Sequence, residues 1–158
     1  MLKNNDIRLI THLRNNSRKK ITRIAREERI PATTIYDKLR AHEKNFVKKH
    51  TTLLDFQKLG LNAKAHIAIR VDRPSREDLR KYLLEHPNIN SLYQVNTGHD
   101  FLAECVFKDA MQQREFIEAV EAQNAELTIY NEIQELRKED FLKGRAFKGA
   151  DVRWQMTR

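Results

Sequence analysis

The chain has 158 residues and a net charge of +8, and 40% of its residues are hydrophobic. This length suits one ordinary domain or two small ones, and no apolar run approaches the roughly 20 residues that a membrane-spanning helix needs. The N-terminal segment lacks the apolar region of a signal peptide, and Cys105 is the only cysteine. We therefore expect a cytoplasmic protein with no membrane partner and no internal disulfide.

The charge is distributed unevenly along the chain. Residues 1–60 carry +9, residues 61–141 carry −5 and residues 142–158 carry +4. A basic N-terminal third joined to an acidic remainder is typical of a nucleic-acid-binding module attached to a second domain. An uneven solvated surface is the alternative that charge alone leaves open.

Apolar residues at helical spacing predict three short helices at the N-terminal end. The first is expected over residues 6–15 and the second over residues 20–28. Pro31 cannot continue a helix but is well placed at the start of one, so the third helix is expected to begin there. The apolar positions that define the three helices are Ile7, Leu9, Ile10, Leu13, Ile21, Ile24, Ala25, Ile35 and Leu39.

The opposite face of the third helix is polar. Thr33, Tyr36, Asp37, Arg40 and Lys44 recur at helical spacing and would share one surface. Two short helices, of which the second has a polar face, are typical of a helix-turn-helix, whose second helix enters the major groove of DNA. An ordinary amphipathic surface helix is the alternative.

Flanking lysines and arginines would bind phosphates, which gives affinity rather than sequence preference. The residues that we predict to contact DNA are Arg18, Lys19, Lys20, Thr33, Thr34, Tyr36, Asp37, Lys38, Arg40, Lys44, Lys48 and Lys49. After the third helix, Asn45 is a residue that tolerates the left-handed conformation. An extended segment is expected to follow over residues 46–56.

The remainder of the chain shows an alternation of strand and helix patterns in the order βαββαβ. Strands are predicted at residues 63–72, 89–95, 101–107 and 127–133. Ser75, with Asp78 three residues later, resembles a capping box at the start of one helix, and Asp109 is predicted to cap the other. This order indicates a ferredoxin-like fold.

We therefore predict an α+β protein of two domains. The predicted parts are a helix-turn-helix domain at residues 1–50, an extended linker at 51–62, a ferredoxin-like effector-binding and oligomerisation domain at 63–141, and a basic tail at 142–158.

From about residue 2 to residue 142 the sequence resembles the Lrp/AsnC family of leucine-responsive (feast/famine) transcription regulators. The resemblance lies in the N-terminal helices, in the segment that follows them, and in a Thr-Gly loop closed by an aspartate. The matching residues are Asp6, Leu9, Ile10, Leu13, Asn16, Arg18, Ile24, Ala25, Ile30, Pro31, Thr33, Ile35, Leu39, Glu43, Val47, Lys48, Thr51, Leu54, Asp55, Leu59, Gly60, Thr97, Gly98, His99 and Asp100.

The resemblance implies a sequence-specific DNA-binding transcription regulator that forms a homodimer or a multiple of dimers. It also implies modulation by a small molecule, typically an amino acid, that binds near the Thr-Gly loop. The effector-binding positions that it assigns are Asn96, Thr97, Gly98, His99 and Asp100. A β-hairpin turn that needs Gly98 only for its backbone angles is the alternative.

Three positions depart from the family pattern. His42 stands where the family usually has leucine, Asn45 replaces a glycine, and Lys20 replaces a small hydroxyl residue that often caps the second helix. The Thr-Gly loop is also about one residue short. These departures affect helix packing, helix capping and the effector loop, and they leave the polar face of the third helix unchanged.

An enzyme is the alternative function, because sirohaem decarboxylases have the same two-domain plan. The polar third helix and the basic N-terminal third favour a regulator, so we predict no enzymatic activity, no catalytic residues and no cofactor. The six histidines lack the spacing of metal ligands, so no metal site is predicted. Cys105 alternates with Ala103 and Phe107 on a predicted strand, which indicates a core position.

Overall fold

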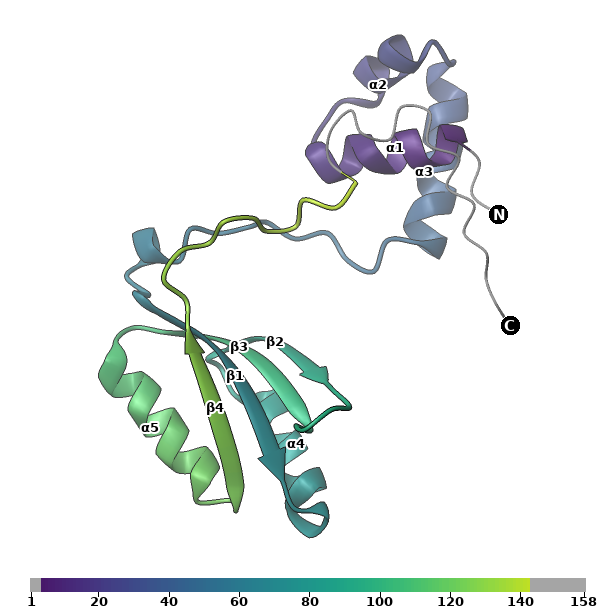
Figure 1. Cartoon of the computed structure of the whole chain (residues 1–158). Coiled ribbons are helices and arrows are strands. Elements are labelled where there is room, and N and C mark those ends of the chain that lie inside the picture. The colour runs from purple at the N-terminus through teal and green to yellow at the C-terminus, as the bar shows by residue number, and fades with distance from the viewer. Residues whose placement is uncertain (1–3, 143–158) are drawn as a thin grey trace. The chain divides into compact units, whose positions relative to one another are not determined.

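The structure, a computed structural model, describes residues 4–142, so the predicted tail lies outside the described residues from residue 143 onward. Figure 1 shows the order of helices and strands along the chain. The helices are α1 (Asn4–Asn15), α2 (Ile21–Glu28), α3 (Ala32–Asn45), α4 (Arg76–Glu85) and α5 (Ala110–Glu121), with short 3-10 turns η1 (Gln57–Leu59) and η2 (Arg73–Ser75). The strands are β1 (Ala63–Val71), β2 (Ile89–Gln94), β3 (Phe101–Phe107) and β4 (Ala125–Asn131).

The first three helices enclose a small apolar core. Leu9, Ile24 and Ile35 are fully buried, and Ala25 and Leu39 are nearly so. Full burial of a leucine or isoleucine side chain contributes about 1.5–3 kcal/mol relative to exposure, so three such residues are enough to orient α1, α2 and α3. The helical spacing predicted all three helices, although Leu9 is the residue of α1 that is completely buried.

The turn between α2 and α3 is formed by Arg29 and Pro31. Arg29 adopts the left-handed conformation, with φ 55° and ψ 43°, and its N–H donates to the carbonyl of Ala25. Pro31 precedes the first residue of α3, as predicted, and its carbonyl accepts from the N–H of Ile35 at 3.1 Å. Asn45, which tolerates the left-handed conformation, does not adopt it here, because it is the last residue of α3.

The four strands form one antiparallel sheet in the order β2-β3-β1-β4. In β3 the side chains of Phe101, Ala103, Cys105 and Phe107 alternate onto one face and are buried, as the sequence predicted. The helices α4 and α5 pack on that same face and complete a single apolar core. This is the predicted ferredoxin-like arrangement.

The two predicted helix caps had different outcomes. The Asp109 side chain accepts a hydrogen bond from the N–H of Gln112 at 3.0 Å, so the cap of α5 is confirmed. Ser75 makes no capping hydrogen bond, so the capping box predicted for α4 is wrong. The cause is η2, which gives Ser75 helical backbone angles before α4 begins, whereas a capping residue is extended.

The strand predicted at residues 127–133 begins and ends two residues earlier, as β4. Asn124 has a left-handed φ of 60° and reverses the chain after α5, so pairing with β1 begins at once, with Ala125 opposite Val71. Ile133, which the prediction placed in the strand, is 99% exposed.

The chain forms two compact units. The second unit is Leu53–Leu136, and the described residues 137–142 group with the N-terminal helices rather than with the sheet. Arg14 of α1 holds this returning segment, because its guanidinium donates to the carboxylate and the carbonyl of Glu139 and to the carbonyl of Phe141, each at 2.9–3.1 Å. The predicted boundary at residue 141 did not include this return of the chain.

Among the described residues, no helix has both the length and the apolar character that crossing a membrane requires.

Candidate nucleic-acid interface and effector loop

The outward face of α3 is polar and exposed over its full length. Ile35 and Leu39 face the core, whereas Thr33, Asp37 and Arg40 are exposed. Thr34, Tyr36 and Lys44 are exposed as well, and 54% of the surface of Tyr36 is accessible. The helix therefore offers hydroxyl, carboxylate, guanidinium and ammonium groups from one rigid element, which is the chemistry that contacts base edges in a major groove.

Two of the predicted phosphate-binding lysines are held in contacts within the first unit. Lys38 donates to a carboxylate oxygen of Asp6 in α1 at 2.7 Å. Lys19 pairs with Glu27 of α2 and donates to Nδ1 of His12 at 3.0 Å. Both lysines join helices to one another, so their charges are partly compensated before any DNA is bound.

The contact with Lys19 also indicates which ring nitrogen of His12 accepts a hydrogen bond and which one donates. An ammonium group can only donate, so Nδ1 of His12 accepts, and Nε2 carries the proton that it donates to Glu28 at 2.8 Å. The hydrogen bond from Lys19 lowers the pKa of Glu27, with a smaller contribution in the same direction from Arg23. This network of His12, Lys19, Glu27 and Glu28 joins α1 to α2.

Other basic side chains of the first unit have no such compensation. Within residues 4–142, no ion pair engages the exposed side chains of Arg18, Lys20, Lys44, Lys48 and Lys49. Arg26 and Arg29, which were not among the predicted DNA-binding residues, are also exposed and make no ion pair in this part of the chain. Their position next to Pro31 was the available signal, because the turn of a helix-turn-helix lies close to DNA.

His42 occupies a core position of the first unit. Its exposed fraction is 5%, and neither ring nitrogen makes a hydrogen bond. Nε2 lies 3.4 Å from a carboxylate oxygen of Asp6, the same oxygen that Lys38 contacts, and the ring packs against Phe46. His42 is thus a buried polar ring without a hydrogen bond, beside the ion pair of Asp6 and Lys38.

The predicted effector residues lie in the loop between β2 and β3. Gly98 has a φ of +76°, a conformation that favours glycine. Asp100 is bound from two sides, since its carboxylate accepts from the N–H of Val71 at 2.9 Å and pairs with Arg76 at 3.0 Å. His99 contacts the hydroxyl of Thr128 at 3.3 Å. In this chain Asp100 therefore fastens the loop to β1 and α4.

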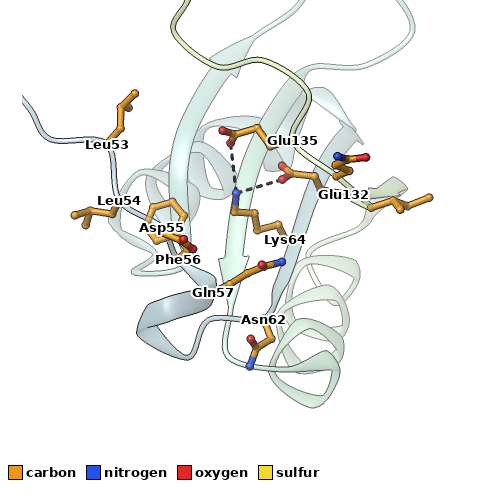
Figure 2. A pocket seen from close by; sticks show the side chains of 11 residues that line it. Leu53, Leu54, Asp55, Phe56, Gln57, Asn62, Lys64, Glu132 and Glu135 are labelled. Carbon is orange, nitrogen blue, oxygen red and sulfur yellow. Dashed lines mark hydrogen bonds and ion pairs between the residues drawn. The ribbon is translucent and has the colours of Figure 1, made fainter. Parts of the chain in front are cut away.

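The second unit also contains a pocket that the sequence analysis did not predict. Its volume is about 590 Å³, and its walls are residues 53–57, Asn62 and Lys64 on one side and residues 132–135 on the other. Figure 2 shows the Lys64 ammonium pointing between Glu132 and Glu135, at 3.2 and 3.5 Å. The volume is within the range of small-molecule sites, but its only lysine is already paired with these two carboxylates.

The single cysteine of the chain, Cys105, lies in the core of the sheet. The Cys105 thiol is fully buried in the sheet, and burial, assisted by the charge of Glu104, raises its pKa to about 12. Such a thiol is protonated at neutral pH and is a packing group. No cluster of three or more histidine, cysteine or acidic side chains suited to a metal ion occurs in residues 4–142.

No family model matches the sequence. Among curated proteins, the transcriptional regulator AzlB of Bacillus subtilis is 31% identical over 78 residues, which cover 48% of this chain and 50% of AzlB. The uncharacterized HTH-type transcriptional regulator PH1916 of Pyrococcus horikoshii is 32% identical over 92 residues, which cover 58% of this chain and 61% of that protein. The chain thus matches only about half to three-fifths of the length of these two relatives.

Solved structures match over more of the chain. Bacillus subtilis LrpC superposes with a TM-score of 0.81 at 20% identity, covering 87% of this chain and 98% of LrpC. The transcriptional regulator NMB0573 of Neisseria meningitidis, solved as a complex with L-Met, also gives 0.81, at 17% identity, covering 87% of this chain and 94% of that one. An AsnC family transcriptional regulator from Agrobacterium tumefaciens gives 0.76 at 16% identity, covering 87% and 94%.

These matches define a class of protein by its fold: an N-terminal helix-turn-helix joined to a C-terminal ferredoxin-like domain. The particular fold is that of the Lrp/AsnC regulators, and the resemblance predicted from the sequence is confirmed at this level. AzlB and PH1916 are both named as transcriptional regulators.

Proposed function

We propose that this protein is a sequence-specific DNA-binding transcription regulator that inserts α3 into the major groove. The observation that carries the proposal is the division of α3 into two faces. Ile35 and Leu39 fix the helix on the core of the first unit, and the exposed face offers Thr33, Asp37 and Arg40. A surface helix without a ligand needs no such concentration of base-contacting side chains beside unpaired cations.

The unpaired cations supply the sequence-independent part of the binding energy. Arg18, Lys20, Lys48 and Lys49 flank the helix-turn-helix in the sequence, and each phosphate that they neutralise releases counterions from the duplex. We therefore assign these residues to phosphates and the exposed face of α3 to bases. Lys19 and Lys38 contribute less to binding than these unpaired residues, because each is already paired within the first unit.

The proposal includes a homodimer or a multiple of dimers. The helices α4 and α5 cover one face of the sheet, and in the described chain Tyr93 and Tyr130 on the other face are each more than half exposed. Tyrosine is enriched in protein interfaces, which supports packing of a second copy against this face. A symmetric dimer binds palindromic half-sites about one helical turn, or a multiple of it, apart.

The proposal also includes a small-molecule effector such as an amino acid. A solved relative in fold is complexed with L-Met. Gly98 leaves the backbone of the loop open, because no described residue other than Gly98 and its two chain neighbours has an atom within 4 Å of the position that a Cβ would occupy. Because Asp100 is paired with Arg76, the backbone N–H groups of residues 96–99 are better placed than this carboxylate to bind the effector. DNA affinity and assembly state that stay constant across a full amino-acid panel would contradict this part of the proposal.

The test of the main proposal is a binding titration of the full chain across salt concentrations. One duplex carries DNA from upstream of the protein's own gene, and the other has the same composition in scrambled order. We expect tighter binding to the upstream duplex and a steep decrease of affinity with salt for both. Weak binding to both duplexes, or equal binding with no sequence preference, would contradict the proposal.

A further inference from the structure

Asp37 places an exposed carboxylate on the surface of α3 that would meet DNA. Other acidic residues of the first unit are paired with basic groups: Asp6 with Lys38, and both Glu27 and Glu28 with side chains of neighbouring segments. Within residues 4–142 the Asp37 side chain makes no hydrogen bond and no ion pair. Its negative charge is therefore uncompensated where a polyanion is expected to bind.

An uncompensated carboxylate at this place weakens binding to every duplex, because DNA carries one negative charge per roughly 1.7 Å of its axis. Only a hydrogen bond donated by the DNA offsets that loss. In the major groove the donors are the N4 amino group of cytosine and the N6 amino group of adenine. In adenine the amino group lies beside the N7 acceptor, which repels a carboxylate, so aspartate pairs with cytosine, whereas asparagine pairs with adenine through N6 and N7.

The position of Arg40 defines where this cytosine lies. Arg40 follows Asp37 by three residues on α3, so the two share one helix face and are separated by about 4.5 Å along the axis. Base pairs are stacked about 3.4 Å apart. The carboxylate and the guanidinium therefore reach the same base pair or adjacent base pairs.

We propose that Asp37 selects a cytosine in each DNA half-site, at most one base-pair step from the guanine that Arg40 contacts. This inference rests on the proposed function, because it assigns a base to one side chain of the recognition helix. Asp37 lowers affinity for most sequences and restores it where the cytosine is present, so its effect is on specificity.

The experiment is a selection of binding sites from duplexes with a random central segment. It uses the full-length chain as wild type and as Asp37→Asn, Asp37→Ala and Glu43→Gln. Glu43 is the matched control, because it is an exposed carboxylate of the same helix that lies near the C-terminal end and contacts His50 at 3.6 Å. Thermal unfolding of each variant shows whether it is folded before its sites are compared.

The wild type is expected to select sites that contain a cytosine at one position. Sites selected by Glu43→Gln should keep this cytosine, and sites selected by Asp37→Asn should have adenine in its place. Asp37→Ala should show no preference at this position. Substitution of this base pair should weaken wild-type binding roughly 5- to 150-fold and leave the affinity of Asp37→Ala nearly unchanged. Identical selected sites for all four proteins, with equal gains in affinity for Asp37→Asn and Glu43→Gln, would overturn the inference and leave the regulator proposal intact. A wild type that selects no site would overturn both.

Discussion

The exposed face of α3 and the loop between β2 and β3 were both predicted to bind other molecules, and their polar groups are partnered differently. On α3, Asp37 and Arg40 have no ion pair within the described residues. In the loop, Asp100 accepts a backbone hydrogen bond and pairs with Arg76. A satisfied group gains little from a ligand, whereas an exposed unpaired group has its full bonding capacity available. Residue type and spacing predicted the polar face of α3, and the family resemblance predicted the loop, but only the contacts show which of their polar groups already have partners.

The largest expected effect comes from removing the contacts of the loop. Asp100→Ala leaves the N–H of Val71 without its acceptor and Arg76 without its partner, so the free energy of unfolding should fall by about 1–3 kcal/mol. Urea denaturation of the full chain measures this change. Thr97→Ala is the control, since within residues 4–142 the hydroxyl of Thr97 makes one hydrogen bond, with Asn96 at 3.3 Å. Equal small losses in the two variants would show that Asp100 does not fasten the loop.

The complementary change on α3 should affect binding and spare stability. Arg40→Ala is expected to cost about 1–3 kcal/mol of binding free energy at a selected site and to relax the preference for guanine. Its unfolding midpoint should match that of the wild type, because the Arg40 side chain is exposed. Arg114→Ala on α5 removes an exposed arginine of the other unit, one that is paired with Glu118, and should leave DNA binding unchanged. A similar loss of affinity in both variants would remove Arg40 from the interface.

His42 is a polar group that is buried without a hydrogen bond, unlike the exposed groups of α3 and the paired Asp100. His42→Leu should raise the free energy of unfolding by about 1–2 kcal/mol, since an unsatisfied buried imidazole is replaced by an apolar side chain. Urea denaturation is the measurement, and the ion pair of Asp6 with Lys38 remains in place. A destabilised variant would show that the contact of His42 with Asp6 at 3.4 Å stabilises the native state.

Replacing a paired lysine and replacing an unpaired lysine should change the salt dependence of DNA binding by different amounts, and this effect is smaller than those above. Lys48→Ala is expected to weaken binding to all duplexes alike and to lower the slope of log affinity against log salt by about one. Lys19→Ala should change that slope less, because its ammonium group is already paired with Glu27 and His12. Salt titrations of both variants on one scrambled duplex make the comparison. Equal changes in slope would mean that the pairing of Lys19 does not survive DNA binding.

The smallest expected effect is a dependence of the free energy of unfolding on pH that comes from His86 in the second unit. Burial lowers the pKa of His86 from its ordinary value of 6.5, and its ring packs against Phe116 and Tyr82. The imidazole of His86 therefore binds a proton more readily in the unfolded chain than in the folded one. Its contribution to the free energy of unfolding is complete above pH 6.5 and decreases as the pH falls below that value. His86→Phe should reduce the difference in unfolding free energy between pH 8 and pH 5.5. An unchanged difference would show that other groups cause the pH dependence.

Local patterns were sufficient for much of the fold. The alternation of Phe101, Ala103, Cys105 and Phe107 gave β3 with correct bounds, and Asp109 gave the cap of α5, because both signals act over a few neighbouring residues. The bounds of β4 depend on its pairing with β1, which no short window of sequence contains, so that prediction was displaced by two residues.

The sequence was enough to predict which residue types lie in the candidate site. It was not enough to predict which of these side chains pair with other residues of the chain. Lys38 and Asp6 are 32 residues apart in sequence, and Asp100 and Val71 are 29 apart. These contacts form only when separate elements pack together, so the sequence could not show which charges are compensated. The return of residues 137–142 to Arg14 has the same origin.

The central claim is that the unpaired face of α3 contacts DNA. Amide NMR spectra of the full chain, recorded while a selected duplex is added, test it most directly. We expect the largest shifts in residues 31–44, smaller ones at Lys48 and Lys49, and no change in residues 96–100. Largest shifts in residues 96–100 or along β4, with α3 unaffected, would contradict it.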